Sequence, residues 1–208
     1  PSLYKLYKGK TLQEDNIQLI NLGGKDKWLE GKKALENVLS GFKKSFEYVI
    51  YLFDSDMSFE LGKKGRTDNM LFIGKQDIED SINNKIWISF VKDATDGKVN
   101  ITEEEIQKIK DNIPNNIAGN KEQKFYKILE KDVKEKYNAS LEEKITWPIL
   151  PSKGSDLANL LLKYIDSIDS VSPKIKDAFD KLTTEDNTLF ETQKQEVLFE
   201  KNGIAKEL

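Results

Sequence analysis

The feature that constrains this chain most is a short apolar run that ends in two closely spaced aspartates. Residues 48–53 are all aromatic, β-branched or aliphatic, and Asp54 and Asp56 follow them with one serine between. A run of this length and composition is typical of a central strand buried on both faces of a sheet. We therefore expect such a strand over residues 46–53, with the two aspartates just past its carboxyl end.

The segments on either side of this run predict an α/β fold. Residues 16–22 alternate apolar and polar side chains and predict a strand, and residues 27–44 have helical spacing. Residues 69–73 predict a third short strand. Because a strand–helix–strand order usually gives parallel pairing, we expect the first two strands to pair in parallel.

The second half of the chain has mainly helical periodicity. Thr102 and Glu105 match a capping box at the start of one helix. We therefore predict an α/β core over residues 1–100 and a helical extension over residues 101–208 that packs on it. Within this extension we expect four more helices, over residues 121–137, 155–168, 173–182 and 189–199.

The composition excludes several kinds of chemistry. The chain has no histidine and no cysteine, so it has no histidine-based triad, no zinc–thiolate site and no disulfide. Catalysis would have to use Asp, Glu, Lys, Tyr, Ser or Thr, which suit oxygen-liganded ions such as Mg²⁺ or Mn²⁺. The net charge of −3 is not that of a strongly basic nucleic-acid binder. All three tryptophans are expected in the core.

Asp54 and Asp56 are the first candidates for a metal site. Residues at i and i+2 of a strand point to the same side, about 6.6 Å apart, so two carboxylates there can share a divalent cation. Ligands of open α/β sheets also gather at the carboxyl ends of the strands. The simpler alternative is that Asp54 caps a turn and Asp56 is solvated.

Two stretches together resemble part of a known domain. The segment Ile17–Lys25, which ends in Gly-Gly-Lys, is followed by a predicted helix and then by Tyr48–Asp56 with its Asp-Ser-Asp ending. This arrangement resembles the TOPRIM domains of OLD-family nucleases and related phage-defence proteins. The resemblance implies a TOPRIM-like, mainly parallel sheet flanked by helices, and magnesium-dependent cleavage of nucleic acid.

Two later stretches extend the resemblance to about residue 165. Residues 74–80 resemble the family's acidic Ile-Glu segment, and residues 151–158 resemble its Lys-Gly element. The resemblance implies that Asp54 and Asp56 are metal ligands, and that Glu79, with Asp77 or Asp80, completes the shell. It also implies that Lys153 assists at the scissile phosphate. The alternatives are ordinary acidic charge at a helix start and a solvated loop lysine.

Four basic residues are candidates for contacts with nucleic acid. Lys25 follows two glycines and could meet a phosphate at a helix start, although a simple strand-to-helix turn needs the same glycines. Lys63, Lys64 and Arg66 form a basic loop near the two aspartates. An ordinary basic surface loop explains them equally well.

One element of the family is missing. A TOPRIM domain also uses a glutamate at the end of its first strand, and no strand precedes Ile17; Glu14 lies in a polar turn. Either the first strand lies upstream of Pro1, or the domain has lost it. The leading hypothesis is therefore an endonuclease module of an OLD-like defence protein, whose missing glutamate must be supplied. The alternative is a catalytically inert TOPRIM-like module that binds nucleic acid or protein.

The remaining expectations concern partners and a third class of protein. Receiver and haloacid-dehalogenase-like domains also use a metal-binding aspartate, but the order of motifs and Met57-Ser58 do not match them. Nucleic acid is the expected partner, DNA ahead of RNA, together with an ATPase domain or subunit; homo-oligomerisation stays open. No apolar run approaches the roughly 20 residues of a membrane span, and no signal peptide is visible, so we expect a cytoplasmic protein.

Overall fold

The protein is an α/β structure, and the part of the chain that the structure describes contains a sheet of two parallel strands. The computed structural model describes residues 1–22, 27–40, 49–57, 69–115 and 120–184. The helices are α1 (Ser2–Lys8), α2 (Trp28–Leu39), α4 (Ile78–Ser81), α5 (Asn84–Ala94), α6 (Glu103–Asn112), α7 (Phe125–Ala139), α8 (Ser155–Leu161) and α9 (Pro173–Thr184). Two 3₁₀ turns are η3 (Lys121–Gln123) and η4 (Ile168–Ser170), and the strands are β1 (Tyr51–Asp54) and β2 (Met70–Ile73).

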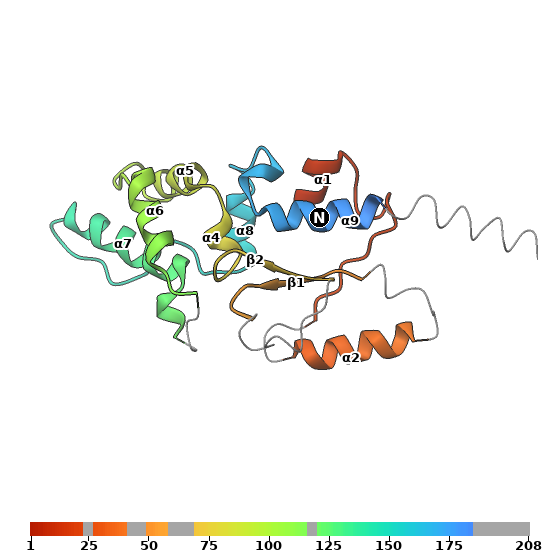
Figure 1. The fold of residues 1–208 in the computed structure, drawn as a ribbon. Helices are drawn as coiled ribbons and strands as arrows, with labels where there is room; N and C mark the ends of the chain where they lie inside the picture. Colours follow the sequence, from red (N-terminus) through yellow and green to blue (C-terminus); the bar gives the residue numbers. More distant parts are fainter. Residues whose placement is uncertain (23–26, 41–48, 58–68, 116–119, 185–208) are drawn as a thin grey trace, which may run out of the picture.

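The two strands pair in parallel and in register, with Tyr51 opposite Met70 and Asp54 opposite Ile73. Figure 1 shows α2 on one side of this pair and α1 with α9 on the other. The alternation of side chains along each strand explains the two layers. Tyr51, Phe53 and Met70 form a small cluster with Trp28 and Leu35 of α2, whereas Ile73 belongs to the main core.

The prediction for the central strand is only partly correct. Strand β1 begins at Tyr51, residues 49–50 are not part of it, and residues 46–48 lie outside the described part of the chain. It is not buried on both faces, because Leu52 is 39% exposed. The helix α9 packs against β2, and the face of β1 that carries Leu52 is only partly covered.

The strand predicted over residues 16–22 does not form. The parallel partner of β1 is β2, and residues 17–22 have no ladder pairing. Leu22 lies instead against α2, where a side chain at Gly31 would come within 2.9 Å of the Leu22 carbonyl oxygen. Leu19 and Ile20 are more than half exposed. Alternation alone does not make a strand where no neighbouring strand accepts its hydrogen bonds.

The main core joins the two halves of the chain. Tyr4 of α1 packs edge-on against Phe179 of α9, with ring centroids 5.0 Å apart, and both belong to one cluster with Trp87. Trp87 is fully buried and packs edge-on against Phe125 and in a tilted arrangement against Tyr126, both of α7. The predicted boundary at residue 100 therefore falls within a single hydrophobic cluster.

Three further sequence predictions have different outcomes. The capping box is confirmed, because the Thr102 hydroxyl accepts from the backbone N–H of Glu105 and the Glu105 carboxylate accepts from that of Thr102. The placement of all tryptophans in the core is wrong, since Trp147 is 63% exposed. The helix predicted over residues 189–199 lies outside the described residues. None of the described helices is long and apolar enough to cross a membrane.

Candidate functional site

The turn that follows β1 is fixed against the loop that follows β2. The backbone N–H of Ser55 donates to Ile73 O at 3.1 Å, and that of Asp56 donates to Gln76 O at 2.9 Å. The Ser55 hydroxyl donates to the carbonyl of Gly74 at 2.6 Å. The carboxyl ends of the two parallel strands are thus held side by side. Asp54 and Asp56, at the end of β1, therefore lie beside the acidic residues of the loop after β2.

The loop after β2 is shaped around the carboxylate of Asp80. This carboxylate accepts hydrogen bonds from the backbone N–H groups of Lys75 (2.6 Å), Gln76 (2.6 Å) and Asp77 (2.9 Å). Gly74 has φ +74°, and a Cβ there would come within 1.8 Å of the Asp77 carbonyl oxygen. Only glycine fits such a turn. Asp77 and Asp80 also form the capping box of α4.

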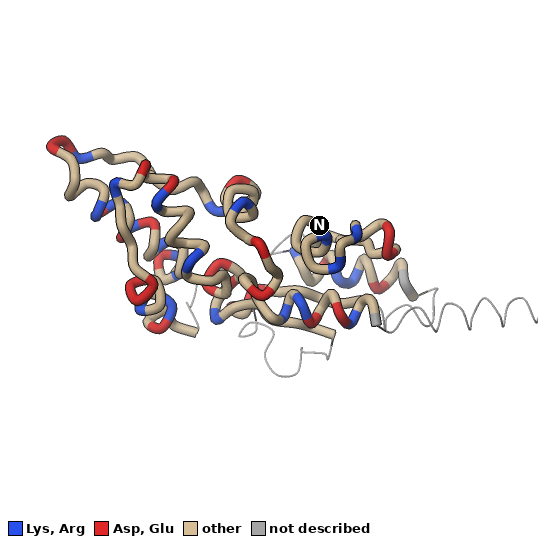
Figure 2. The backbone as a smooth tube through the Cα atoms, turned by 90° about the horizontal axis from the view of Figure 1, so that it is seen from above, with Lys and Arg blue, Asp and Glu red and all other residues tan. Residues whose placement is uncertain are grey.

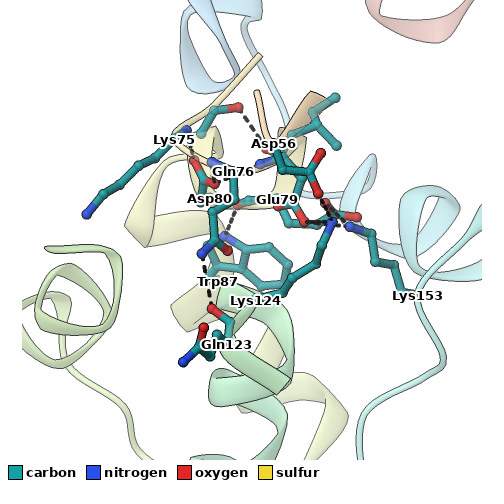
Figure 3. Close-up of polar contacts among 12 residues, drawn as sticks. Asp56, Lys75, Gln76, Glu79, Asp80, Trp87, Gln123, Lys124 and Lys153 are labelled. Atoms are coloured by element: carbon teal, nitrogen blue, oxygen red, sulfur yellow. Dashed lines mark hydrogen bonds and ion pairs between the residues drawn. The ribbon is translucent and has the colours of Figure 1, made fainter. Parts of the chain in front are cut away.

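Two lysines from distant parts of the chain reach this acidic edge of the sheet. The ammonium of Lys153, in the loop before α8, lies 2.7 Å from Asp77 Oδ2 and 2.7 Å from Glu79 Oε2. The ammonium of Lys124, at the start of α7, lies 3.1 Å from Asp56 Oδ2 and 3.3 Å from Asp77 Oδ2. Figure 3 shows both lysine side chains converging on these carboxylates from different elements.

We call these six residues, Asp54, Asp56, Asp77, Glu79, Lys124 and Lys153, the acid–lysine cluster. Its carboxylates are largely removed from water: the side chain of Asp77 is fully buried, and those of Asp56 and Glu79 are each 9% exposed. The Lys153 side chain is 35% exposed, so the cluster meets solvent on the Lys153 side. The cluster combines buried anions with cations that solvent can reach.

The neighbouring charges shift the pKa values of the carboxyl groups in opposite directions. Burial, and then the charge of Asp77, raises the pKa of Glu79 to about 7. Burial also works against the ionised form of Asp77, but the Lys153 ammonium, a hydrogen bond with Glu79 and the Lys124 charge together outweigh it, and the pKa of Asp77 lies below its ordinary value. Burial and then the Asp77 charge raise the pKa of Asp54. Such a separation of pKa values between neighbouring acids is frequent at functional sites.

The donor atoms have the chemistry that Mg²⁺ and Mn²⁺ prefer, since they are all carboxylate oxygens. One of them, Asp77 Oδ1, is buried and makes no hydrogen bond within the described structure, whereas the buried Glu79 Oε2 lies 2.7 Å from the Lys153 ammonium. In their present positions, however, no three acidic side chains of the described residues surround a common point suited to a metal. The lysine ammonium groups lie among the carboxylates and supply the positive charge.

The site residues predicted from the sequence separate into three groups. Asp54, Asp56, Glu79 and Lys153 all belong to the acid–lysine cluster. Asp80, expected as a metal ligand, has its two oxygens directed at backbone amides of its own loop. The four basic residues expected to contact nucleic acid, Lys25, Lys63, Lys64 and Arg66, lie outside the described part of the chain.

Sequence reasoning missed Lys124 and Gln76. Gln76 is fully buried, and its side-chain amide donates to Pro114 O at 2.7 Å and to Gln123 O at 3.1 Å. Lys124 follows Gln123 directly and precedes the apolar start of α7. Lys124 belongs to no motif, and Gln76 lies in the 74–80 segment, whose resemblance assigns it no role; only the contact between the loop after β2 and the start of α7 gives both residues a place at the site.

A surface hollow of the described residues lies away from the acid–lysine cluster. A cavity of about 560 Å³ opens between the start of α5 and α6 and is lined by Asn84, Glu103, Glu104, Gln107, Lys108, Asp111 and Asn112. It shares no residue with the acid–lysine cluster. Figure 2 shows lysines and acidic residues interspersed along the described elements. We therefore take the cluster, where buried charges converge, as the candidate site in preference to this open hollow.

Comparison with known proteins adds no relative: no protein-family model, no curated protein and no solved structure matches this chain. The geometry of the acid–lysine cluster and the sequence resemblance are therefore what point to a function.

Proposed function

We propose that this chain is a metal-dependent nuclease module that hydrolyses phosphodiester bonds at the acid–lysine cluster. The observation that carries the proposal is that Lys153 contacts both Asp77 and Glu79 beside the Asp54-Ser-Asp56 segment. Lys153 lies 76 residues after Asp77 in the sequence. Acidic metal ligands and a lysine at one edge of a parallel sheet are the groups that phosphoryl-transfer chemistry needs.

In this proposal Asp54, Asp56 and Glu79 would hold Mg²⁺ or Mn²⁺. Their oxygens suit such ions, and Glu79 Oε2 is buried beside the Lys153 ammonium, at 2.7 Å. A bound ion supplies an activated water and stabilises negative charge on the phosphate. Burial, and then the charge of Asp77, now raises the pKa of Glu79, and a bound cation would favour the ionised form of Glu79 against both effects.

The chain's own lysine would act on the substrate. Lys153 is one-third exposed, so its ammonium can reach a bound phosphodiester while one side of it stays paired with Asp77. A fixed positive charge beside the phosphoryl oxygens stabilises the charge that develops on them in the transition state. Asp77 would be a positioning residue, since its buried carboxylate holds the Lys153 ammonium at 2.7 Å.

The wider assignment follows from the sequence resemblance. We propose a TOPRIM-like module of an OLD-like defence protein, acting on DNA in the cytoplasm together with an ATPase domain or subunit. Glu14 is an unsuitable first-strand glutamate, because its carboxylate accepts hydrogen bonds from the backbone N–H and the hydroxyl of Thr11 in a turn. The missing glutamate would have to come from another segment or another chain.

A cleavage assay tests this function. The protein would be incubated with plasmid, single-stranded DNA and RNA in the presence of Mg²⁺ or Mn²⁺, with EDTA as the blank. We expect metal-dependent cleavage that is lost in Asp54→Ala and in Asp56→Ala. The exposed Asp156 provides the matched control, since Asp156→Ala removes an acid outside the cluster. Cleavage that persists in both cluster variants would refute the assignment.

The second candidate is a catalytically inert module that binds nucleic acid or protein. One observation favours it: Lys124 and Lys153 already pair with Asp56, Asp77 and Glu79. A closed ion-pair network of this kind is also what a purely structural cluster would contain. Nucleic-acid binding without cleavage under every metal condition would establish this second function in place of the first.

A further inference from the structure

We propose that Lys124 is a second cationic residue of the site, which contacts a phosphate of the nucleic-acid substrate, and that Gln76 positions it. This inference rests on the proposed function and adds a residue that neither the motifs nor the resemblance identifies. Lys124 lies in the acid–lysine cluster, yet it comes from the start of α7, far from the Lys153 loop in sequence.

The first support is the place of the Lys124 ammonium. It lies 3.1 Å from Asp56 Oδ2 and 3.3 Å from Asp77 Oδ2, and the Lys124 side chain is 17% exposed. Asp77 Oδ2 is also the atom that Lys153 contacts at 2.7 Å. Both ammonium groups therefore meet at one carboxylate oxygen, and a phosphate that reaches Lys153 comes close to Lys124 as well.

The second support is the way in which the start of α7 is fixed. The side-chain amide of Gln76 donates to Gln123 O, next to Lys124, and to Pro114 O. Phe125, directly after Lys124, is fully buried and lies against Trp87 with ring centroids 5.3 Å apart. These contacts hold the backbone of Lys124 without help from its ammonium.

The third support is a comparison of what the ammonium could contribute. If Lys124 served only to anchor α7, an apolar side chain would stabilise the fold about as well, because a partly buried ion pair loses much of its attraction to the cost of removing its charges from water. The anchor is already made by Gln76 and Phe125. A positive charge kept at the edge of solvent beside Asp56 has a clearer use in binding an anion.

The divalent ion of the proposed function sharpens this role. An ion bound by Asp56 would compete with the Lys124 ammonium for the same carboxylate, since both are cations. Lys124 would then be released from Asp56, while the cluster's gain in positive charge would draw in a phosphate. The same competition predicts that removing the Lys124 charge strengthens metal binding.

The test measures binding rather than cleavage. The affinity of fluorescently labelled single-stranded and duplex DNA would be measured by anisotropy, with Ca²⁺ in place of Mg²⁺, over a range of salt concentrations. Lys124→Gln is compared with Lys121→Gln, which removes the same charge from an exposed position in the adjacent η3 turn. We expect about tenfold weaker binding in Lys124→Gln, and a slope of log K against log salt that is smaller by about 1.

The test of Gln76 uses a double-mutant cycle. We expect Gln76→Leu to weaken binding in the wild-type background and to change it little in the Lys124→Gln background, because Gln76 acts through Lys124. Mn²⁺ affinity, followed by electron paramagnetic resonance, should rise several-fold in Lys124→Gln and stay unchanged in Lys121→Gln. Equal effects of Gln76→Leu in both backgrounds would overturn the positioning role.

Each outcome decides the inference. One outcome is that the wild type and Lys124→Gln bind DNA equally well, and both bind it better than an unrelated acidic protein does. That outcome overturns the role of Lys124 and leaves the proposed function intact. Wild-type protein that neither binds nor cleaves nucleic acid overturns both. If Lys124→Gln folds poorly, Lys124→Arg decides: recovered binding supports a charge contact, and binding as weak as in Lys124→Gln overturns it.

Discussion

Lys153 and Asp77 form an ion pair of 2.7 Å in which the carboxylate is fully buried and the lysine is one-third exposed. The pair joins the loop before α8 to the loop after β2, across 76 residues. It therefore ties the helical part of the chain to the edge of the sheet at the point where the acidic residues gather.

The first prediction concerns this pair. Asp77→Asn keeps the size of the side chain but removes the charge that faces Lys153 and Lys124, and it should lower the free energy of unfolding by about 3 kcal/mol. Urea denaturation measures the effect. The exposed Asp156 gives the control, since Asp156→Asn should change the free energy by no more than about 0.5 kcal/mol. Equal stability of the two variants would show that the pair does not hold the elements together.

The second prediction concerns pH. The pKa of Glu79 rises from 4.5 to about 7 in the folded protein, so the folded state holds this proton more tightly than the unfolded state. The resulting stability is fully present below pH 4.5 and is lost as the pH rises through about 7. Asp77 has a lowered pKa, and its contribution is lost only as the pH falls toward its ordinary value of 3.8 and below.

Wild-type protein should therefore lose on the order of 2 kcal/mol between pH 4.5 and pH 7 through Glu79. Glu79→Gln, which cannot ionise, should lack this part of the loss, whereas Glu122→Gln in the exposed η3 turn should retain it. Urea denaturation at several pH values measures both. Parallel curves for wild type and Glu79→Gln would count against a buried, uncharged Glu79.

The third prediction concerns the backbone of the loop after β2. In Gly74→Ala the new methyl group would meet the Asp77 carbonyl at 1.8 Å, and the positive φ would add strain. We expect a loss of about 3 kcal/mol or more in the free energy of unfolding. Gly97→Ala is the matched control, since Gly97 has φ +72° and no atom within 4 Å of the added Cβ.

Gly97→Ala should therefore cost only the strain of a left-handed residue, about 1 to 2 kcal/mol. The difference between the two alanine variants measures the collision at Gly74. A loss no larger in Gly74→Ala than in Gly97→Ala would mean that the loop opens easily, and that the acidic residues on it are not held as described.

The fourth prediction separates a structural acid from a metal ligand. Asp80→Asn removes charge-assisted hydrogen bonds to backbone amides and should lower the free energy of unfolding by about 2 kcal/mol. Mn²⁺ affinity should change little in Asp80→Asn and should fall at least tenfold in Asp54→Asn. A similar fall of Mn²⁺ affinity in both variants would place Asp80 among the ligands.

The sequence predicted the elements whose signals are local. The strand β2 and the capping box at Thr102 lie where the pattern of neighbouring residues placed them. The aspartates at the end of β1 are also visible from the sequence, because a buried apolar run and the polar residues after it are adjacent in the chain. Local propensity and capping depend on residues within one or two turns, so the sequence contains this information directly.

Tertiary structure alone decided which strands pair and which charges meet. Residues 17–22 alternate as a strand would, but β2 is the partner of β1 and Leu22 lies against α2. Lys124 enters the site only because Gln76 holds the start of α7, and Asp80 turns to its own loop because three backbone amides point at it. Strand pairing and ion pairs between distant residues depend on how the whole chain packs, and no local pattern encodes that packing.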